Sequence, residues 1–277
     1  IPEWVGIVLY AVILVRIGCS PDPFFKTPFY TFFITTGIYG IISVISFMVG
    51  ARLHLTPPWA WIFKLSWVLN QIGAMGSLMG KLVIVIHRRA VLNSVDLMEN
   101  RWSRACVRRL ILVQFSIPFA STATIYFYDY KYTEKGGTQL VATFADEDLV
   151  TSKIIVTIGY FGYVVATIVF AFLTSKSLAK LSSIVGEGNI RRKILRQQRV
   201  MFIIVAFCVF SHFIKAVHQI LWGISTLLGL SGATAAIVPY YSLANGLATY
   251  TAPVVLFICS SKGRRLFIPR FAFPSSS

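Results

Sequence analysis

An apolar stretch that ends at paired arginines constrains this chain more than any other feature. The segment Leu65–Ile86 reads LSWVLNQIGAMGSLMGKLVIVI and carries one charged residue, Lys81. At about 1.5 Å of rise per residue, a helix of this length crosses the hydrocarbon core of a bilayer. His87, Arg88 and Arg89 follow directly, and basic residues at a helix end are typical of the cytoplasmic side. We therefore expect a membrane-spanning helix that ends in the cytosol.

This stretch is also more polar than a helix surrounded by lipid needs to be. Small residues allow neighbouring helices to approach closely, and amide side chains in hydrocarbon need hydrogen-bond partners. We therefore expect the helix to lie at the centre of a bundle. The small and polar residues that favour this position are Asn70, Gln71, Gly73, Gly76, Ser77 and Gly80.

Six further apolar segments indicate a multi-pass membrane protein. Hydrophobic residues make up 56% of the chain and charged residues 13%, whereas about a quarter of the residues in soluble domains are charged. The sequence therefore predicts an all-α membrane protein, with a seven-transmembrane helix bundle over residues 1–259 and a basic amphipathic tail over residues 260–277. The expected helices span residues 1–17, 29–51, 65–86, 110–128, 154–173, 200–224 and 239–259.

Two of the predicted connections have patterns of their own. The loop Asp129–Lys153 contains a short alternating run, Thr138–Phe144, which is consistent with a strand. After the fifth helix, the glycines and asparagine at 186–189 predict a break between two helical extensions. The small-residue run at 225–238 is expected to be a loop.

The distribution of lysine and arginine predicts the orientation. A net charge of +16 would suggest a nucleic-acid partner in a soluble protein. Here 19 of the 26 basic residues fall in the first, third and fifth loops and the tail. The positive-inside rule then places the N-terminus outside and the C-terminus in the cytoplasm. We expect a multi-pass plasma-membrane protein that meets membrane lipid, with no nucleic-acid partner, because no basic stretch alternates with stacking aromatic residues.

The sequence lacks the common motifs of enzymes and metal sites. There is no glycine-rich phosphate loop, no HExxH and no CxxC, and we expect no acidic residue within a membrane-spanning helix. We therefore expect no enzyme, no catalytic or metal-binding residue and no cofactor. The seventh helix also has no lysine to hold retinal. A seven-helix channel or transporter is the alternative function, although no internal repeat is visible and the run VMFIIVAFCVF in the sixth helix is wholly apolar.

A polar stripe on the sixth helix is the candidate ligand site. His212, Lys215, Gln219 and Trp222 share one helical face, and His218 lies beside them. Lys215 is about 24 Å from the inner end of this helix, which places it in the outer third of the bundle. A pocket there would be completed by Trp67, Asn70 and Gln71 from the third helix and by Tyr241, Asn245 and Thr249 from the seventh.

An alternative for this stripe is hydrogen bonding between helices without a ligand.

Lys81 has a different expected role. It lies about two turns above Arg88, so its long side chain is expected to extend along the helix toward the cytosol.

The pattern of seven helices, basic inner loops and Arg88 at the inner end of the third helix resembles a G-protein-coupled receptor. Three stretches are similar to nematode serpentine chemoreceptors of the gamma/V superfamily. They are KTPFYTFFITTGIYGIISVISF, the run Arg52–Trp59 and VIHRRAVL. The resemblance implies a chemosensory receptor that couples an extracellular small-molecule ligand to a cytoplasmic heterotrimeric G protein.

Arg88 matches the arginine that the resemblance implies in G-protein coupling, and a simple charge that sets the topology is the alternative. The chain departs from the common receptor pattern at several points. His87 precedes Arg88 in place of an acidic residue, and the sixth helix has no proline. Pro253 in the seventh helix lacks the usual asparagine and tyrosine around it, and no cysteine pair is placed to join the third helix to the outer loop. A disulfide is therefore not expected.

The charge distribution generates a test of topology. Single cysteines placed in the loop Asp129–Lys153 are expected to react with a membrane-impermeant reagent applied to intact cells, because this loop lies on the side poor in basic residues. Cysteines placed in the loop at 175–199 serve as the control and are expected to react only after permeabilisation. The opposite pattern would reverse the predicted orientation.

Overall fold

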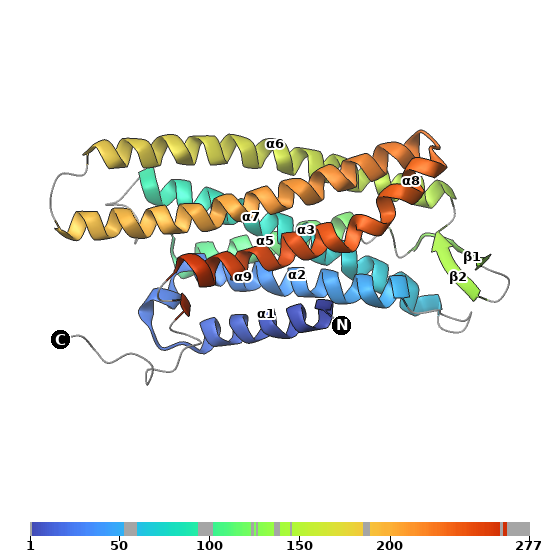
Figure 1. Cartoon of the computed structure of the whole chain (residues 1–277), viewed down its shortest axis with the longest axis horizontal. Helices are drawn as coiled ribbons and strands as arrows, with labels where there is room; N and C mark the ends of the chain where they lie inside the picture. The colour runs from blue at the N-terminus through green and yellow to red at the C-terminus, as the bar shows by residue number, and fades with distance from the viewer. Residues whose placement is uncertain are drawn as a thin grey trace.

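The computed structural model describes residues 2–52, 60–93, 102–122, 125, 127–135, 139–144, 146–184, 189–260 and 263–264. Seven long helices form an elongated bundle (Figure 1). They are α1 (Pro2–Cys19), α2 (Pro28–Arg52), α3 (Ala60–Asn93), α5 (Arg104–Thr122), α6 (Asp146–Ile184), α7 (Asn189–Leu227) and α9 (Tyr241–Cys259). The shorter elements are η1 (Pro23–Lys26), α8 (Ser231–Ile237), η5 (Val238–Tyr240) and the strands β1 (Tyr130–Lys135) and β2 (Gln139–Phe144).

In the part of the chain that the structure describes, five helical segments are long and apolar enough to cross a membrane. They are Pro28–Gly50, Trp61–Leu92, Val150–Ala179, Arg199–Leu227 and Ser231–Cys259. The apolar part of α1 is shorter, Trp4–Cys19. The first turns of α5 carry three arginines, at positions 104, 108 and 109, so its apolar part is short as well. The predicted seven-helix membrane bundle is confirmed.

Helix α3 lies at the centre of the bundle, as its small and polar residues predict. It packs against α2, α5, α6 and α7. In its most apolar stretch 72% of the residues are buried, compared with 22% in the most apolar stretch of α6. The outer face of α6 instead exposes large apolar side chains such as Ile158, Phe161 and Phe172. In a membrane protein an apolar helix face of this kind meets lipid.

A close approach between the backbones of α2 and α3 depends on a glycine. A Cβ atom built on Gly73 of α3 would lie 2.6 Å from both the Ser43 nitrogen and the Tyr39 carbonyl oxygen of α2. Both are backbone atoms, so a side chain at this position would push the helices apart. Small residues at helix crossings in membranes serve this purpose in general.

The turn between α1 and α2 is built by local side-chain contacts. The carboxylate of Asp22 accepts a hydrogen bond from the Phe24 backbone nitrogen at 2.9 Å, which caps η1. The ammonium of Lys26 donates to the Gly18 carbonyl at the end of α1, also at 2.9 Å. Pro28 then begins α2, a position where the missing N–H costs nothing.

The described connections that the charge distribution assigns to opposite sides of the membrane lie at opposite ends of the bundle. Figure 1 shows the β1–β2 hairpin and α8 at one end, and the neighbouring ends of α6 and α7 with the end of α9 at the other. The start of α1 faces the hairpin end. The strands pair antiparallel, with Tyr130 opposite Phe144, so the predicted strand is confirmed. Asp148, in the first turn of α6, accepts a hydrogen bond at its carboxylate from the Asp129 backbone nitrogen at 2.8 Å. This bond ties the residue before β1 to α6.

Several predicted boundaries need correction. The fourth helix ends at Thr122, not at residue 128, and the run at 225–238, where we expect a loop, contains α8 and the first residue of η5. Among the described residues, acidic side chains do occur inside helix bounds, but only in first turns: Glu3 in α1 and residues 146–148 in α6. The predicted break after the fifth helix falls between α6 and α7. The predicted amphipathic tail lies almost wholly outside the described residues.

The contact at Gly73 predicts a strong difference between two glycine substitutions in membrane helices. Gly73→Ala is expected to lower the thermal unfolding midpoint by about 5 °C, because the added methyl group meets backbone atoms that cannot rotate away. Gly162→Ala on α6 is the matched control, since a Cβ there meets nothing within 4 Å. The control is expected to leave the midpoint unchanged or to raise it. Equal effects in purified, lipid-reconstituted protein would contradict the described α2–α3 contact.

Candidate ligand-binding core

Two lysines are buried in the middle of the bundle. Lys81 of α3 is 5% exposed and Lys215 of α7 is 2% exposed. A lysine at the centre of a membrane costs about 2.5–3.5 kcal/mol on insertion scales unless the surrounding protein compensates for it. Among the side chains that the structure describes, no aspartate or glutamate is buried. The compensation shown here therefore comes from neutral hydrogen-bond acceptors.

Lys215 begins a chain of polar side chains that crosses the bundle. Its ammonium donates to Asn245 Oδ1 at 2.5 Å. The Asn245 amide donates to Ser43 Oγ at 3.5 Å, and Ser43 donates to Asn70 Oδ1 at 2.9 Å. The Tyr241 hydroxyl reaches the same Asn70 oxygen at 3.3 Å. Helices α7, α9, α2 and α3 are thus joined by one hydrogen-bonded network, as buried amides and ammonium groups require.

Lys81 contacts α7 and α9 about one helical turn further from the hairpin end than the Lys215–Asn245 contact. The predicted extension of its side chain toward the cytosol is wrong. Its ammonium lies 2.7 Å from His212 Nδ1 on α7 and donates to the Ala248 carbonyl of α9, also at 2.7 Å. These acceptors hold the side chain inside the bundle, so it does not need to reach the membrane surface. An ammonium only donates, so His212 Nδ1 accepts and the proton of the neutral ring lies on Nε2. Nε2 is 3.5 Å from Ser77 Oγ.

The Tyr241 ring lies beside Lys215 and packs with two further aromatic side chains on the hairpin side. The ring centroids of His218, Trp222 and Tyr241 lie 5.8 to 6.2 Å apart in every pairing. The Lys215 ammonium lies 6.0 Å from the centre of the Tyr241 ring, within reach of a cation–π interaction. His218 Nε2 is also 2.9 Å from the Ile237 carbonyl of α8. This cluster therefore ties α7 to α8 and α9 next to the buried charge.

The structure brings most, but not all, of the predicted ligand residues together. Asn70, His212, Lys215, His218, Trp222, Tyr241 and Asn245 belong to the two connected groups described above. Gln71 and Gln219 are buried at 5% and 3% exposure, but Lys215 donates to Asn245 and to neither of them. Trp67 lies apart, with its ring centroid 6.1 Å from that of Phe63 in a separate apolar cluster.

One member of the network was missed from the sequence. Ser43 of α2 is fully buried at 0% exposure and links Asn245 to Asn70. Serine is common in membrane helices, where its hydroxyl can bond the preceding turn of its own helix. The feature that would identify Ser43 is its packing against Gly73 of the adjacent helix. A single sequence does not show which residues of two helices meet.

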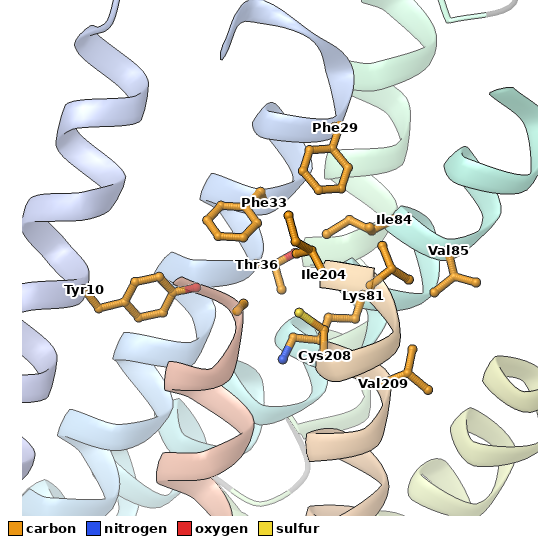
Figure 2. Close-up of a pocket in the computed structure, with 12 residues that line it drawn as sticks. Tyr10, Phe29, Phe33, Thr36, Lys81, Ile84, Val85, Ile204, Cys208 and Val209 are labelled. Carbon is orange, nitrogen blue, oxygen red and sulfur yellow. The ribbon is translucent and has the colours of Figure 1, made fainter. Parts of the chain in front are cut away.

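A small cavity lies on the Lys81 side of the core (Figure 2). Its volume is about 20 Å³, and its lining comes from α1, α2, α3, α7 and α9. Of the residues predicted to bind a ligand, none lines it. The Lys215 group is instead packed against its neighbours, with Lys215, Asn245 and Tyr241 each less than 5% exposed.

The model of the family described as Serpentine type 7TM GPCR chemoreceptor Srv matches residues 3–273. The chain belongs to this family. The resemblance to nematode serpentine chemoreceptors is thereby confirmed, and the protein is a multi-pass membrane protein of a chemoreceptor class, not of an enzyme class. No curated protein matches the sequence.

The serpentine receptor places the two arginines near the C-terminal end of α3 in different surroundings. Arg88 is 8% exposed, and its guanidinium carbon lies 4.1 Å from the centre of the Phe29 ring of α2. Arg89 is half-buried and lies 5.7 Å from the Phe170 ring of α6. His87 is buried beside Trp102, with a centroid distance of 4.5 Å. Arg88 therefore points into the bundle, whereas a charge that only sets topology would reach the headgroups.

Proposed function

We propose that this chemoreceptor binds a small extracellular molecule next to Lys215 and couples to a heterotrimeric G protein at the end of the bundle that carries Arg88. The single observation that carries the proposal is a positive charge buried between α7 and α9 beside the Tyr241 ring, which packs in turn against the rings of His218 and Trp222. Ligand sites combine mostly apolar walls with a few polar groups in this way. The N-terminus and the hairpin would then lie outside the cell.

The chemistry of Lys215 favours an acidic or strongly hydrogen-bond-accepting ligand. An ammonium has three donors, and Asn245 accepts from one of them. An anionic group would also neutralise a charge that no buried carboxylate in the described residues balances. Trp222 and His218 are half-buried at the hairpin side of Lys215, where they would form the wall at which a ligand enters.

The same two helices offer a route from ligand to coupling surface. Helix α7 carries both Lys215 and His212, and α9 carries both Asn245 and Ala248. A ligand that takes the place of Asn245 as partner of Lys215 would shift α7 against α9. That shift would change the distances from Lys81 to its own partners on both helices. A bundle with two packed arrangements responds to a ligand in this manner, and Arg88 would take part in the inner arrangement.

The experiment that tests this proposal is a ligand screen with a G-protein readout, followed by two variants. Lys215→Met keeps the apolar stem of the side chain and removes the charge. For an acidic ligand identified in the screen, we expect more than a tenfold loss of potency with unchanged surface expression, because a charged hydrogen bond contributes about 1.5–3 kcal/mol. Unchanged potency would exclude Lys215 from the ligand site.

The second variant addresses coupling in the same assay. Arg88→Ala is expected to preserve ligand binding and surface expression while reducing G-protein activation. Arg89→Ala is the matched control, because its side chain is more exposed and contacts a different helix. Equal effects of the two substitutions would show that Arg88 acts only as a charge at the membrane border.

A further inference from the structure

The Arg88 guanidinium lies against an aromatic ring of another helix. Its central carbon is 4.1 Å from the centre of the Phe29 ring, at the start of α2. Both side chains are away from water, because Arg88 is 8% exposed and Phe29 is 1% exposed. A cation–π interaction is stronger when both groups are desolvated. His87 and Arg89 flank Arg88 in the chain, so neither sequence neighbour offers it a carboxylate. The Phe29 ring therefore contributes to holding this charge inside the bundle.

The Phe29 ring is fixed in turn by aromatic side chains from η1 and the first turns of α2. Its centroid lies 5.0 Å from that of Tyr30 and 6.2 Å from that of Phe33. Tyr30 is 0% exposed and packs against Phe24 and Phe25 of η1, with centroid distances of 5.2 and 4.9 Å. Aromatic pairs at these separations add to the stability that apolar burial provides. The guanidinium thus meets a ring that has one defined position.

The same ring also borders the inner half of α7. Phe29 and Ile204 of α7 line the same small apolar cavity (Figure 2), and Val205 of α7 lines it as well. All three side chains are buried and belong to one apolar cluster. Helix α7 also carries Lys215 of the proposed ligand site. A shift of α7 against α2 would therefore change the packing of the ring on which Arg88 rests.

The burial of Arg88 indicates which arrangement of the bundle this contact belongs to. A partner that docks on the inner end meets exposed side chains, and an arginine that is 8% exposed offers it little surface. Coupling through Arg88 therefore requires the guanidinium to leave the Phe29 ring. We infer that Phe29 is a positioning residue that holds Arg88 inside the bundle in the absence of ligand and releases it when α7 moves. This inference rests on the proposed coupling role of Arg88 and names the residue that restrains it.

The test measures ligand-independent G-protein activation in cells with matched surface expression. Phe29→Leu keeps an apolar side chain but removes the aromatic face. We expect it to raise basal activation about fivefold, because the loss of a desolvated contact from one of two arrangements shifts the population toward the other. Phe29→Tyr keeps the ring and is expected to keep the wild-type level. Basal activation of Phe29→Leu at the wild-type level would overturn the inference.

Phe33→Leu is the matched control for this substitution. Phe33 stacks on Phe29, is 3% exposed and lines the same cavity. Its replacement disturbs the same cluster but keeps the ring beneath Arg88, so we expect basal activation close to wild type. An equal rise in both variants would show that basal activation responds to packing in general, which would also overturn the inference. If Phe29→Leu does not reach the cell surface, Phe29→Met, with a flexible side chain that fills irregular gaps, takes its place with the same expectation.

A second measurement does not depend on a G protein. The unfolding midpoint is measured in lipid nanodiscs for Phe29→Leu, for Arg88→Met and for the double variant. Because the two side chains are in contact, we expect the loss in the double variant to be about 3 °C smaller than the sum of the single losses. Phe29→Leu with Arg89→Met is the matched cycle and is expected to be additive, since Arg89 lies over the Phe170 ring of α6. Additive losses in the first cycle would contradict the contact and overturn the inference.

Failure of the inference and failure of the proposed coupling role give different results. If Arg88→Ala reduces ligand-stimulated activation while Phe29→Leu leaves basal activation unchanged, only the inference is wrong. If Arg88→Ala leaves activation unchanged, the coupling role is wrong and the inference falls with it.

Discussion

The arrangement of this receptor depends on the burial of two ammonium groups among neutral partners. Lys81 and Lys215 lie on different helices, and each has its acceptors on α7 or α9. Because transferring an unsatisfied ammonium into hydrocarbon is costly, α3, α7 and α9 must face one another at the heights where these acceptors lie. The polar residues thus fix which helices are neighbours, while the apolar residues define only which surfaces face lipid.

Close packing around α3 makes this polar core possible. The approach of α2 to Gly73 brings Ser43 within 2.9 Å of Asn70. Through Ser43 the network extends from α3 to Asn245 on α9 and so to Lys215. A larger residue at position 73 would separate the two helices and leave an amide without its partner. The small-residue crossing and the hydrogen-bond network are therefore one structural feature, although they appear as separate patterns in the sequence.

The features that one helix encodes by itself could be predicted from the sequence. Seven apolar segments, the central position of α3 and the inward face of α7 with Lys215 follow from length, composition and spacing. The features that depend on a neighbouring helix could not. Lys81 turns inward because His212 and Ala248 offer acceptors, which no pattern within α3 reveals. Ser43 was overlooked for the same reason. Trp67 shares α3 with Asn70 but packs in another cluster, and α8 forms from a run of mostly small residues that the sequence alone does not distinguish from a loop.

The most direct test of this account is a double-mutant cycle between Lys215 and Asn245, measured as the unfolding free energy of the receptor in nanodiscs. Asn245→Leu alone is expected to cost about 3–5 kcal/mol, because it leaves a buried ammonium without its acceptor. Adding Lys215→Met is expected to recover more than half of that loss, since the charge that needed the acceptor is gone. Costs that simply add in the double variant would contradict the claim that neutral partners compensate the buried charge.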